Sequence, residues 1–288
     1  MYILFDIGGS KMRLAASRDL KSFGEPVVLR TPRDFKKGMA LFCETVKKLA
    51  GGKKIKAIGG GIAGPLDRAR TRTTNAPNIT TWRNKPLKTS LKTSLKTAVY
   101  LENDTALVGL GETHFGAGKK FKKEGVVAYI TVSTGVGGAR VVDGRVDRNT
   151  YGFEIGWQTI DADGTVCPAA RSPGYLEEYI SGKNVERRTG EKPYDIHDKK
   201  FWDTEARLLA WGLNNTAVHW SPELIILGGS MINGTKKVVI PLDRVRFYFN
   251  KVLKIFPEKP KLVKAELGDY GGLYGSMIYL KQVLSIKY

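Results

Sequence analysis

The sequence predicts an α/β protein made of two domains of similar layout, with a cleft between them. Short apolar runs alternate with segments of helical periodicity along the 288 residues. A strand–glycine–strand opening also occurs twice, in "YILFDIGGSKMRLA" and in "VVAYITVSTGVGGARVV". We expect a smaller first domain at residues 1–112, with the closing helix 271–288 packed back on it, and a larger second domain at residues 113–270.

The first domain is expected to be a sheet with helices between its later strands. A helix is predicted from Asp34, as N-cap, to a stop at Gly51-Gly52, and a second helix in "DTALVGLGETHFG". Strands are predicted in "YILFDI", "RLAAS", "PVVLRT", "KKIKAIGGGIAGPLD" and "TAVYLEN".

A four-residue repeat, "LKTSLKTSLKT", runs from Leu87 to Thr97. Its leucines recur at helical spacing, which predicts a basic amphipathic helix. The repeat is compatible with lipid or RNA contact, but a helix with one buried edge is the favoured interpretation.

The second domain is expected to open with two strands around the glycine loop "STGVGG", a turn at Asp143-Gly144 and a further strand. Later, "PELIILGGSM" predicts another strand that runs into glycines, and "GGLYGSMIYLKQVLSI" predicts a closing helix.

The formal charge of the chain is +19, from 47 basic and 28 acidic residues. Such a charge attracts nucleotides, polyphosphate or nucleic acid, although a solvated basic surface is the favoured interpretation. Two cysteines exclude a disulfide framework, and Cys43 is expected in the core. Because Asp6 interrupts the first apolar run and no run approaches the ~18 residues of a membrane span, we expect a cytoplasmic protein.

Two glycine-rich stretches, "DIGGSK" and "STGVGG", suggest a polyphosphate held from both sides. Glycines let backbone N–H groups approach an anion, and a carboxylate such as Asp6 can hold a metal ion beside it. Each stretch alone is also compatible with an ordinary hairpin turn.

With these pieces in order, the sequence resembles the ROK family of sugar kinases and repressors. The motifs that carry the resemblance are "DIGGSKMRLA", "GIAGPLD", "NAPNITTW", "LENDTALVGLGE", "TVSTGVGGARVVDGRV", "EIGWQTID" and "IILGGS". The resemblance implies two actin-like ATPase (ribonuclease H-like) domains. It also implies ATP-dependent phosphorylation of a hexose, with glucose as the first candidate, at its 6-hydroxyl.

The resemblance also implies roles for particular residues. Asp104 would be the catalytic base, although an Asp at a helix start can equally be an N-cap. Asp6 would hold Mg²⁺ through water. The sugar would be bound by Gly64, Asn78, Asn103, Asp104, Glu154, Trp157 and Glu177. The nucleotide and its phosphates would be bound by Gly8, Gly9, Ser10, Lys11, Ser133, Thr134, Gly135, Gly137, Gly138, Gly228, Gly229 and Ser230.

The chain departs from the family at its zinc site, a His and three cysteines. Trp157 takes the position of the His, and only Cys167 remains downstream. One thiolate cannot complete a four-ligand site, so no zinc is expected. Burial of Trp157, together with Pro168 and Pro173, is expected to hold this segment in place instead.

Three other functions stay open from the sequence. They are a polyphosphate-dependent glucokinase, a non-catalytic sugar-binding regulator and a transcriptional repressor. A repressor would need a DNA-binding module before the core, and the first phosphate strand begins at Tyr2. We therefore expect a sugar and a nucleotide as partners, no specific nucleic acid, no membrane contact, and a homodimer as one possible assembly.

Overall fold

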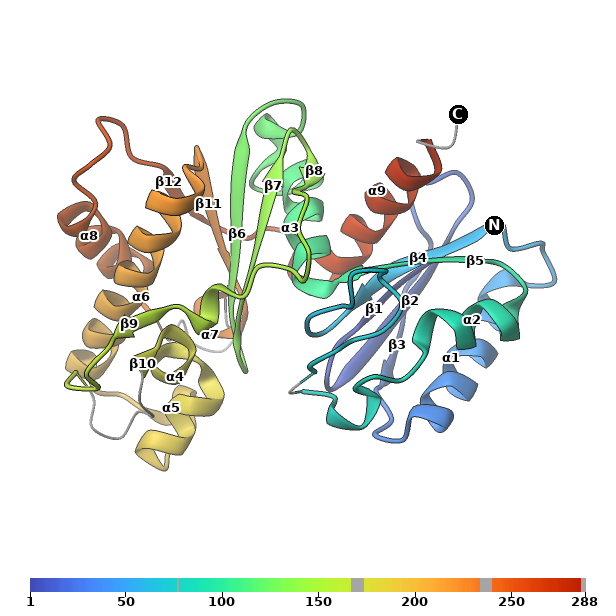
Figure 1. The fold of residues 1–288 in the computed structure, drawn as a ribbon, viewed down its shortest axis with the longest axis horizontal. Helices are drawn as coiled ribbons and strands as arrows, with labels where there is room; N and C mark the ends of the chain where they lie inside the picture. Colours follow the sequence, from blue (N-terminus) through green and yellow to red (C-terminus); the bar gives the residue numbers. More distant parts are fainter. Residues whose placement is uncertain (77, 167–173, 234–239, 286–288) are drawn as a thin grey trace. The chain divides into compact units, whose positions relative to one another are not determined.

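The computed structural model describes residues 1–288 except 77, 167–173, 234–239 and 286–288. The chain forms two compact units (Figure 1). Unit 1 comprises Met1–Lys119, Gly144–Gly152 and Leu267–Tyr288, and unit 2 comprises Lys120–Asp143 and Phe153–Glu266. Residues 113–119, 144–152 and 267–270, which the sequence-based division placed in the second domain, therefore lie in unit 1.

A five-stranded sheet forms the centre of unit 1, in the order β3-β2-β1-β4-β5. Strand β1 pairs antiparallel with β2, and β2 with β3, whereas β1, β4 and β5 run parallel. The strands are β1 (Tyr2–Ile7), β2 (Lys11–Ser17), β3 (Val27–Arg30), β4 (Ala57–Ile62) and β5 (Ala98–Asn103). The carboxyl ends of the three parallel strands consequently meet at one edge of the sheet.

Helices α1 (Phe35–Ala50) and α2 (Leu87–Leu95) cover one face of this sheet. As predicted, Asp34 caps α1 by accepting a hydrogen bond from Lys37 N, and Gly51 ends the helix in the left-handed conformation. The repeat forms α2 with Leu87 and Leu91 buried, which confirms the helix with one buried edge. Cys43 packs, partly buried, against the same core.

Helices α3 (Asp104–Phe115) and α9 (Gly271–Ser285) cover the other face and cross at glycines. A Cβ on Gly275 would overlap the backbone carbonyl of Leu107, and one on Gly111 would lie 2.9 Å from Gly275 N. The two backbones therefore touch at this crossing. Since Asp104 begins α3, the crossing also fixes the position of that carboxylate.

Unit 2 contains the second five-stranded sheet, in the order β12-β11-β6-β7-β8. Its strands are β6 (Val126–Val132), β7 (Val136–Val142), β8 (Arg145–Val146), which belongs to unit 1 by its contacts, β11 (Leu224–Gly228) and β12 (Lys261–Lys264). Strand β6 is antiparallel to β7 and parallel to β11. The predicted glycine hairpin and the turn at Asp143-Gly144 are both present.

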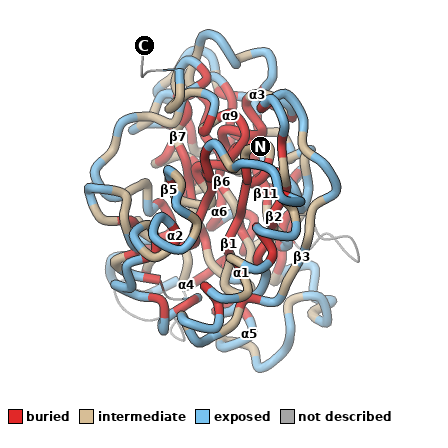
Figure 2. Tube along the Cα trace, turned by 90° about the vertical axis from the view of Figure 1, so that its right-hand side faces the viewer, coloured by how far each residue is buried: buried red, intermediate tan, exposed pale blue. Residues whose placement is uncertain are grey.

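The remaining elements of unit 2 surround this sheet. They are β9 (Thr159–Asp161), β10 (Gly174–Tyr175), α4 (Leu176–Ile180), α5 (Gly182–Thr189), α6 (Lys199–Trp220), α7 (Ser230–Asn233) and α8 (Leu242–Val252). Figure 2 shows that buried residues gather along the strands and on the inner sides of the helices. Within the described part of the chain, no helix combines the length and apolar character that a membrane span requires.

We expect Gly275→Ala to destabilise the protein by about 1–3 kcal/mol, because the new methyl group overlaps the Leu107 carbonyl. This loss should exceed the ~1 kcal/mol that alanine gains over glycine in helix propensity. Denaturant unfolding followed by circular dichroism measures the difference. Gly24→Ala is the matched control, since its Cβ would meet Ala16 O at an ordinary 3.8 Å. A Gly275→Ala protein at least as stable as wild type would contradict the close crossing.

Candidate active site

Three residues lie side by side at the carboxyl edge of the first sheet, and one of them, Asp6, is a predicted site residue. Asp6 of β1 lies opposite Gly61 of β4, which lies opposite Glu102 of β5. A Cβ on Gly61 would lie 2.8 Å from the Cα of Asp104. The missing side chain at Gly61 therefore lets the start of α3 lie directly over β4, and this brings Asp104 toward Asp6.

Asp6 is a buried carboxylate with a raised pKa. Its side chain is 12% exposed, and Arg13 Nη1 donates to its Oδ2 at 3.3 Å. Burial and the negative charge of Asp104 raise the pKa of Asp6 to about 7, although Arg13 opposes the shift. Gly272 of α9 leaves the room that the carboxylate needs, since a Cβ there would lie 2.9 Å from the Asp6 Cγ.

Arg13 is a site residue that the sequence analysis missed. It lies directly opposite Asp6 across the β1–β2 hairpin, and its Nη2 contacts Asp269 Oδ2 at 3.3 Å. The hairpin turns at residues 8–11, where Gly8 N donates a hydrogen bond to the carbonyl of Lys11, the first residue of β2. Counting outward from this loop pairs Asp6 with Arg13, so the glycine turn itself contained the signal.

The N-cap of α3, which is one of the two roles that the sequence analysis considered for Asp104, belongs to Asn103. The N-cap of α3 is Asn103, whose Oδ1 accepts a hydrogen bond from Ala106 N at 3.0 Å, so the N-cap alternative for Asp104 is wrong. Asp104 is the first residue of the helix, and its Oδ1 accepts from Thr105 N. Asn103 Nδ2 donates to Gly64 O at 3.2 Å, which joins two predicted sugar-binding positions.

Asn78 lies against the first glycine loop. A Cβ on Gly9 would be 2.8 Å from both the Cβ and the carbonyl oxygen of Asn78. Neither Gly8 nor Gly9 has a positive φ, so close approach rather than backbone conformation requires glycine at position 9. Thr31 holds the loop from its other side, with Oγ1 donating to Gly8 O at 2.8 Å, while Ser10 and Lys11 are exposed at the tip.

Glu102 and Arg70 form a second pair that the sequence analysis did not identify. Arg70 Nε lies 3.4 Å from Glu102 Oε1, and the same oxygen accepts from Asn103 N at 2.9 Å. Arg70 also donates through Nη2 to Asn149 Oδ1 at 2.7 Å. Burial raises the pKa of Glu102, whereas Arg70 and the Asn103 N–H lower it. The pair supports the backbone immediately before Asp104.

In unit 2, the second glycine loop is held by a carboxylate and by a helix start. Glu177 Oε2 accepts from Val136 N at 2.7 Å and lies against Gly135. Backbone N–H groups at the start of α5 donate to the carbonyls of Ser133 and Thr134, the former from Gly182 at 2.7 Å. The structure therefore brings the predicted sugar residue Glu177 to the predicted phosphate loop.

The "LGGS" glycines lie beside this loop. Gly229 has φ +89°, and a Cβ there would overlap the carbonyl of Val132, the residue before the loop. A Cβ on the buried Gly228 would strike the Tyr129 ring, so neither position admits another residue easily. The backbone at Gly229, just after β11, thus lies against Val132, the last residue of β6 before the loop.

Gly137 and Gly138 lie within β7 rather than in the turn. A Cβ on Gly138 would be 2.6 Å from Ile155 Cγ1, so this glycine makes room for the segment that contains Glu154. Partial removal of Glu154 from water, and the charge of Glu177, raise the pKa of Glu154. Burial likewise raises the pKa of Glu177 despite its hydrogen bond from Val136 N. The two carboxylates therefore interact electrostatically within unit 2.

The expected burial of Trp157 is wrong. Its side chain is 52% exposed, because the short 3₁₀ turn Ile155–Trp157 buries Ile155 and turns the indole outward. The indole contacts the Tyr175 ring, with centroids 5.2 Å apart. Pro168, Pro173 and Cys167 lie outside the described residues.

Asp161 organises the described parts of this segment. Its carboxylate accepts from Tyr179 Oη at 2.6 Å, from Val166 N at 2.9 Å and from Thr165 N at 3.1 Å. The Tyr179 hydrogen bond is the largest cause that lowers the pKa of Asp161. Strand β9 also pairs with β10, so hydrogen bonds join the two ends of the segment.

No group of three or more His, Cys, Asp or Glu side chains suited to a metal ion occurs among the residues described.

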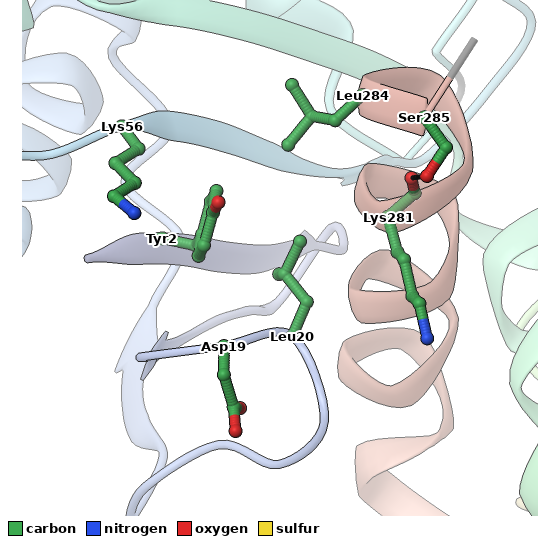
Figure 3. Close-up of a pocket in the computed structure, with 7 residues that line it drawn as sticks. All are labelled: Tyr2, Asp19, Leu20, Lys56, Lys281, Leu284 and Ser285. Carbon is green, nitrogen blue, oxygen red and sulfur yellow. Dashed lines mark hydrogen bonds between the residues drawn. The ribbon is translucent and has the colours of Figure 1, made fainter. Parts of the chain in front are cut away.

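A cavity of about 530 Å³ lies at the opposite end of β1 from Asp6, between Tyr2, Leu20, Lys56, Lys281 and Leu284 (Figure 3). Because it opens at the amino end of β1, this cavity is separate from the candidate site.

Comparison with known proteins places these motifs in a family. The family model described as "ROK family" matches residues 2–283. The chain belongs to the ROK family. It is 33% identical to a glucokinase of Thermotoga maritima, over 83% of each chain, and 26% identical to an N-acetyl-D-glucosamine kinase of Vibrio cholerae, over 96% of this chain and 98% of the relative.

Two solved structures match the whole architecture. A ROK hexokinase from Thermus thermophilus superposes with a TM-score of 0.82 at 28% identity, covering 98% of this chain and 99% of the other. A ROK glucokinase from Streptomyces griseus, in complex with glucose and AMPPNP, gives 0.76 at 26% identity with the same coverage. These matches confirm the predicted α/β fold of actin-like ATPase type.

We expect the stability difference between wild type and Asp6→Asn to depend on pH. The pKa of Asp6 is near 7 when folded and near 3.8 when unfolded, so the folded state holds the proton more tightly between these values. Stability from this group is therefore complete below about pH 4 and is lost as pH rises through 7. Asn does not titrate, so wild type should lose up to about 4 kcal/mol relative to Asp6→Asn.

Denaturant unfolding at pH values from 4 to 8, without divalent cations, measures this difference. Asp34→Asn is the matched control, because it makes the same chemical change at an exposed N-cap. A wild type–Asp6→Asn difference that stays constant over this pH range would show that Asp6 has an ordinary pKa.

Proposed function

We propose that this protein phosphorylates a hexose, with glucose as the first candidate, at its 6-hydroxyl with ATP. The observation that carries the proposal is that Asp6 and Asp104 lie near each other at the carboxyl edge of the first sheet, close enough for their negative charges to repel. The names of the relatives support a sugar kinase, and the glucose–AMPPNP complex of one neighbour supports ATP as donor.

Asp104 is the general base in this reaction. It accepts the proton of the 6-hydroxyl while the oxygen forms a bond to the γ-phosphorus, and the bond between that phosphorus and the β,γ-bridging oxygen breaks to release ADP. Its Oδ1 is oriented by Thr105 N. Asn103 keeps a second amide N–H beyond the one given to Gly64, and that N–H is suited to a neighbouring sugar hydroxyl.

The surroundings of Asp6 fit a Mg²⁺ ion. Burial and Asp104 disfavour the charged form of Asp6 more than Arg13 stabilises it, so a nearby dication would relieve the repulsion. Mg²⁺ commonly keeps several waters, so Asp6 would hold it through water. The ion would supply charge neutralisation for the phosphates of the nucleotide.

In this proposal the two glycine loops bind the phosphates, and the "LGGS" turn binds the adenosine. The carbonyls of Ser133 and Thr134 accept hydrogen bonds from α5, and Ser133 N donates to Gly135 O, so the phosphate would be bound by the remaining N–H groups of that loop. A coupled assay over a panel of hexoses, with ATP and with inorganic polyphosphate, tests sugar and donor together. Turnover of no sugar with either donor would refute the proposal and favour a regulator.

We expect Asp104→Asn to lower kcat by about 10²–10⁴-fold with little change in sugar affinity, because it removes the base and keeps the shape. Steady-state kinetics and sugar binding by calorimetry measure the two effects. Asp34→Asn should be fully active, since Asp34 only caps α1. Near-normal kcat in Asp104→Asn would remove Asp104 from the mechanism.

We also propose that hydrogen bonds to Asp161, rather than zinc, hold the segment after Glu154. Tyr179→Phe should then destabilise the protein by about 1–3 kcal/mol, since it deletes a buried hydrogen bond to a carboxylate. Tyr151→Phe, at a 58% exposed side chain, is the control. Elemental analysis of protein purified without a metal-affinity tag should find no stoichiometric zinc, and stoichiometric zinc would refute this account.

A further inference from the structure

The positive charge of the chain is concentrated in two segments, residues 33–56 and 83–97. Together they contain 13 basic and 2 acidic residues, a net +11 of the total +19. Twelve of the 13 basic side chains are exposed, and Lys88 is half-buried. We call these two segments the basic face.

The two segments lie side by side along their length. At the start, Trp82 Nε1 donates to Pro32 O at 3.0 Å and the indole packs on Gly38. At the end, Thr97 Oγ1 donates to Ile55 O at 3.3 Å. Between these points α1 and α2 share one core, and Figure 1 shows them as neighbours on one side of the sheet. The basic face is therefore a continuous strip, about 24 Å long from the 16 residues of α1.

Little of this charge is neutralised within the strip. One acidic residue, Asp34, uses a carboxylate oxygen to cap α1, and the other, Glu44, pairs with Lys48 at 2.7 Å. Residues 83–97 contain five basic and no acidic side chains. Three hydroxyl side chains of α2 add hydrogen-bond donors that suit phosphate oxygens: Thr89, Ser90 and Thr93.

The side chains of the basic face favour one class of polyanion over the others. Membrane insertion requires large apolar side chains at the surface, and both segments, which are described throughout, have none among the exposed large hydrophobic residues. Stacking on unpaired bases requires exposed aromatic rings, and both Phe35 and Trp82 are at least partly buried. What remains is charge and hydroxyl groups, which contact a phosphate backbone and read no bases.

We propose that the basic face binds the phosphate backbone of duplex nucleic acid without sequence preference. This is separate from the proposed kinase site, which lies at the carboxyl edge of the sheet. Binding should be of the non-specific kind, with Kd between about 10⁻⁶ and 10⁻⁴ M at physiological salt, and should weaken steeply as salt rises.

Fluorescence anisotropy with a labelled 20-base-pair DNA duplex, from 50 to 200 mM salt, tests the proposal. The variant Lys85→Gln/Lys92→Gln/Lys96→Gln removes three exposed charges from the basic face. The control Lys199→Gln/Lys200→Gln/Lys254→Gln removes three exposed charges from unit 2, so both proteins have the same net charge. We expect the first variant to bind at least tenfold more weakly at 50 mM salt, with a log–log salt slope shallower by up to about 3, and the control to bind like wild type.

Three outcomes would overturn the proposal. Equal weakening in both variants would show a diffuse charge effect with no defined face. Displacement of the duplex by stoichiometric ATP would place the binding at the nucleotide site. Tighter binding to phosphatidylserine vesicles than to the duplex would assign the face to membranes. Retained kinase activity and circular dichroism in both variants show that folding is unaffected.

Discussion

The electrostatic interaction between two carboxylates at the end of the first sheet sets the requirements for the rest of unit 1. Asp6 is buried within reach of the charge of Asp104, and its pKa is raised accordingly. Bringing them together needs missing side chains at Gly61 and Gly272, and it needs Arg13 opposite Asp6. The arrangement costs stability and leaves a site that favours a cation, as expected where structure serves function.

The two units share one strand arrangement but place different side chains at the corresponding position. In unit 1, Asp6 of β1 lies opposite Gly61 on the parallel neighbour; in unit 2, Thr131 of β6 lies opposite Gly228. A carboxylate thus occupies the first position and a neutral hydroxyl the second. A metal ion and a proton acceptor suit the former, while backbone N–H groups for a phosphate suit the latter.

The fold was predictable because local signals agreed with one another. Asp34 and Gly51 bounded α1, and leucine spacing defined α2. Pairing across the sheet was not predicted, so Arg13 and the Glu102–Arg70 pair were missed. The prediction that Trp157 is buried was also wrong, because its exposure depends on how Ile155 fits against Gly138, a contact between distant segments. Sequence identified the motifs, whereas the residues that orient them came from tertiary structure.

The large positive charge of the chain does not determine the chemistry of Asp6. Arg13, through its charge and its hydrogen bond, is the cation that lowers the pKa of this carboxyl. Exposed charges are screened over roughly 8–10 Å at physiological salt, and the sheet separates the basic face from the face that Asp6 shares with α9. The pKa of Asp6 is therefore explained by its burial, by Asp104 and by Arg13, without the surface charge. We expect that the lysines of the basic face can change without altering the pKa of Asp6, which makes a second role for that face compatible with an intact candidate site.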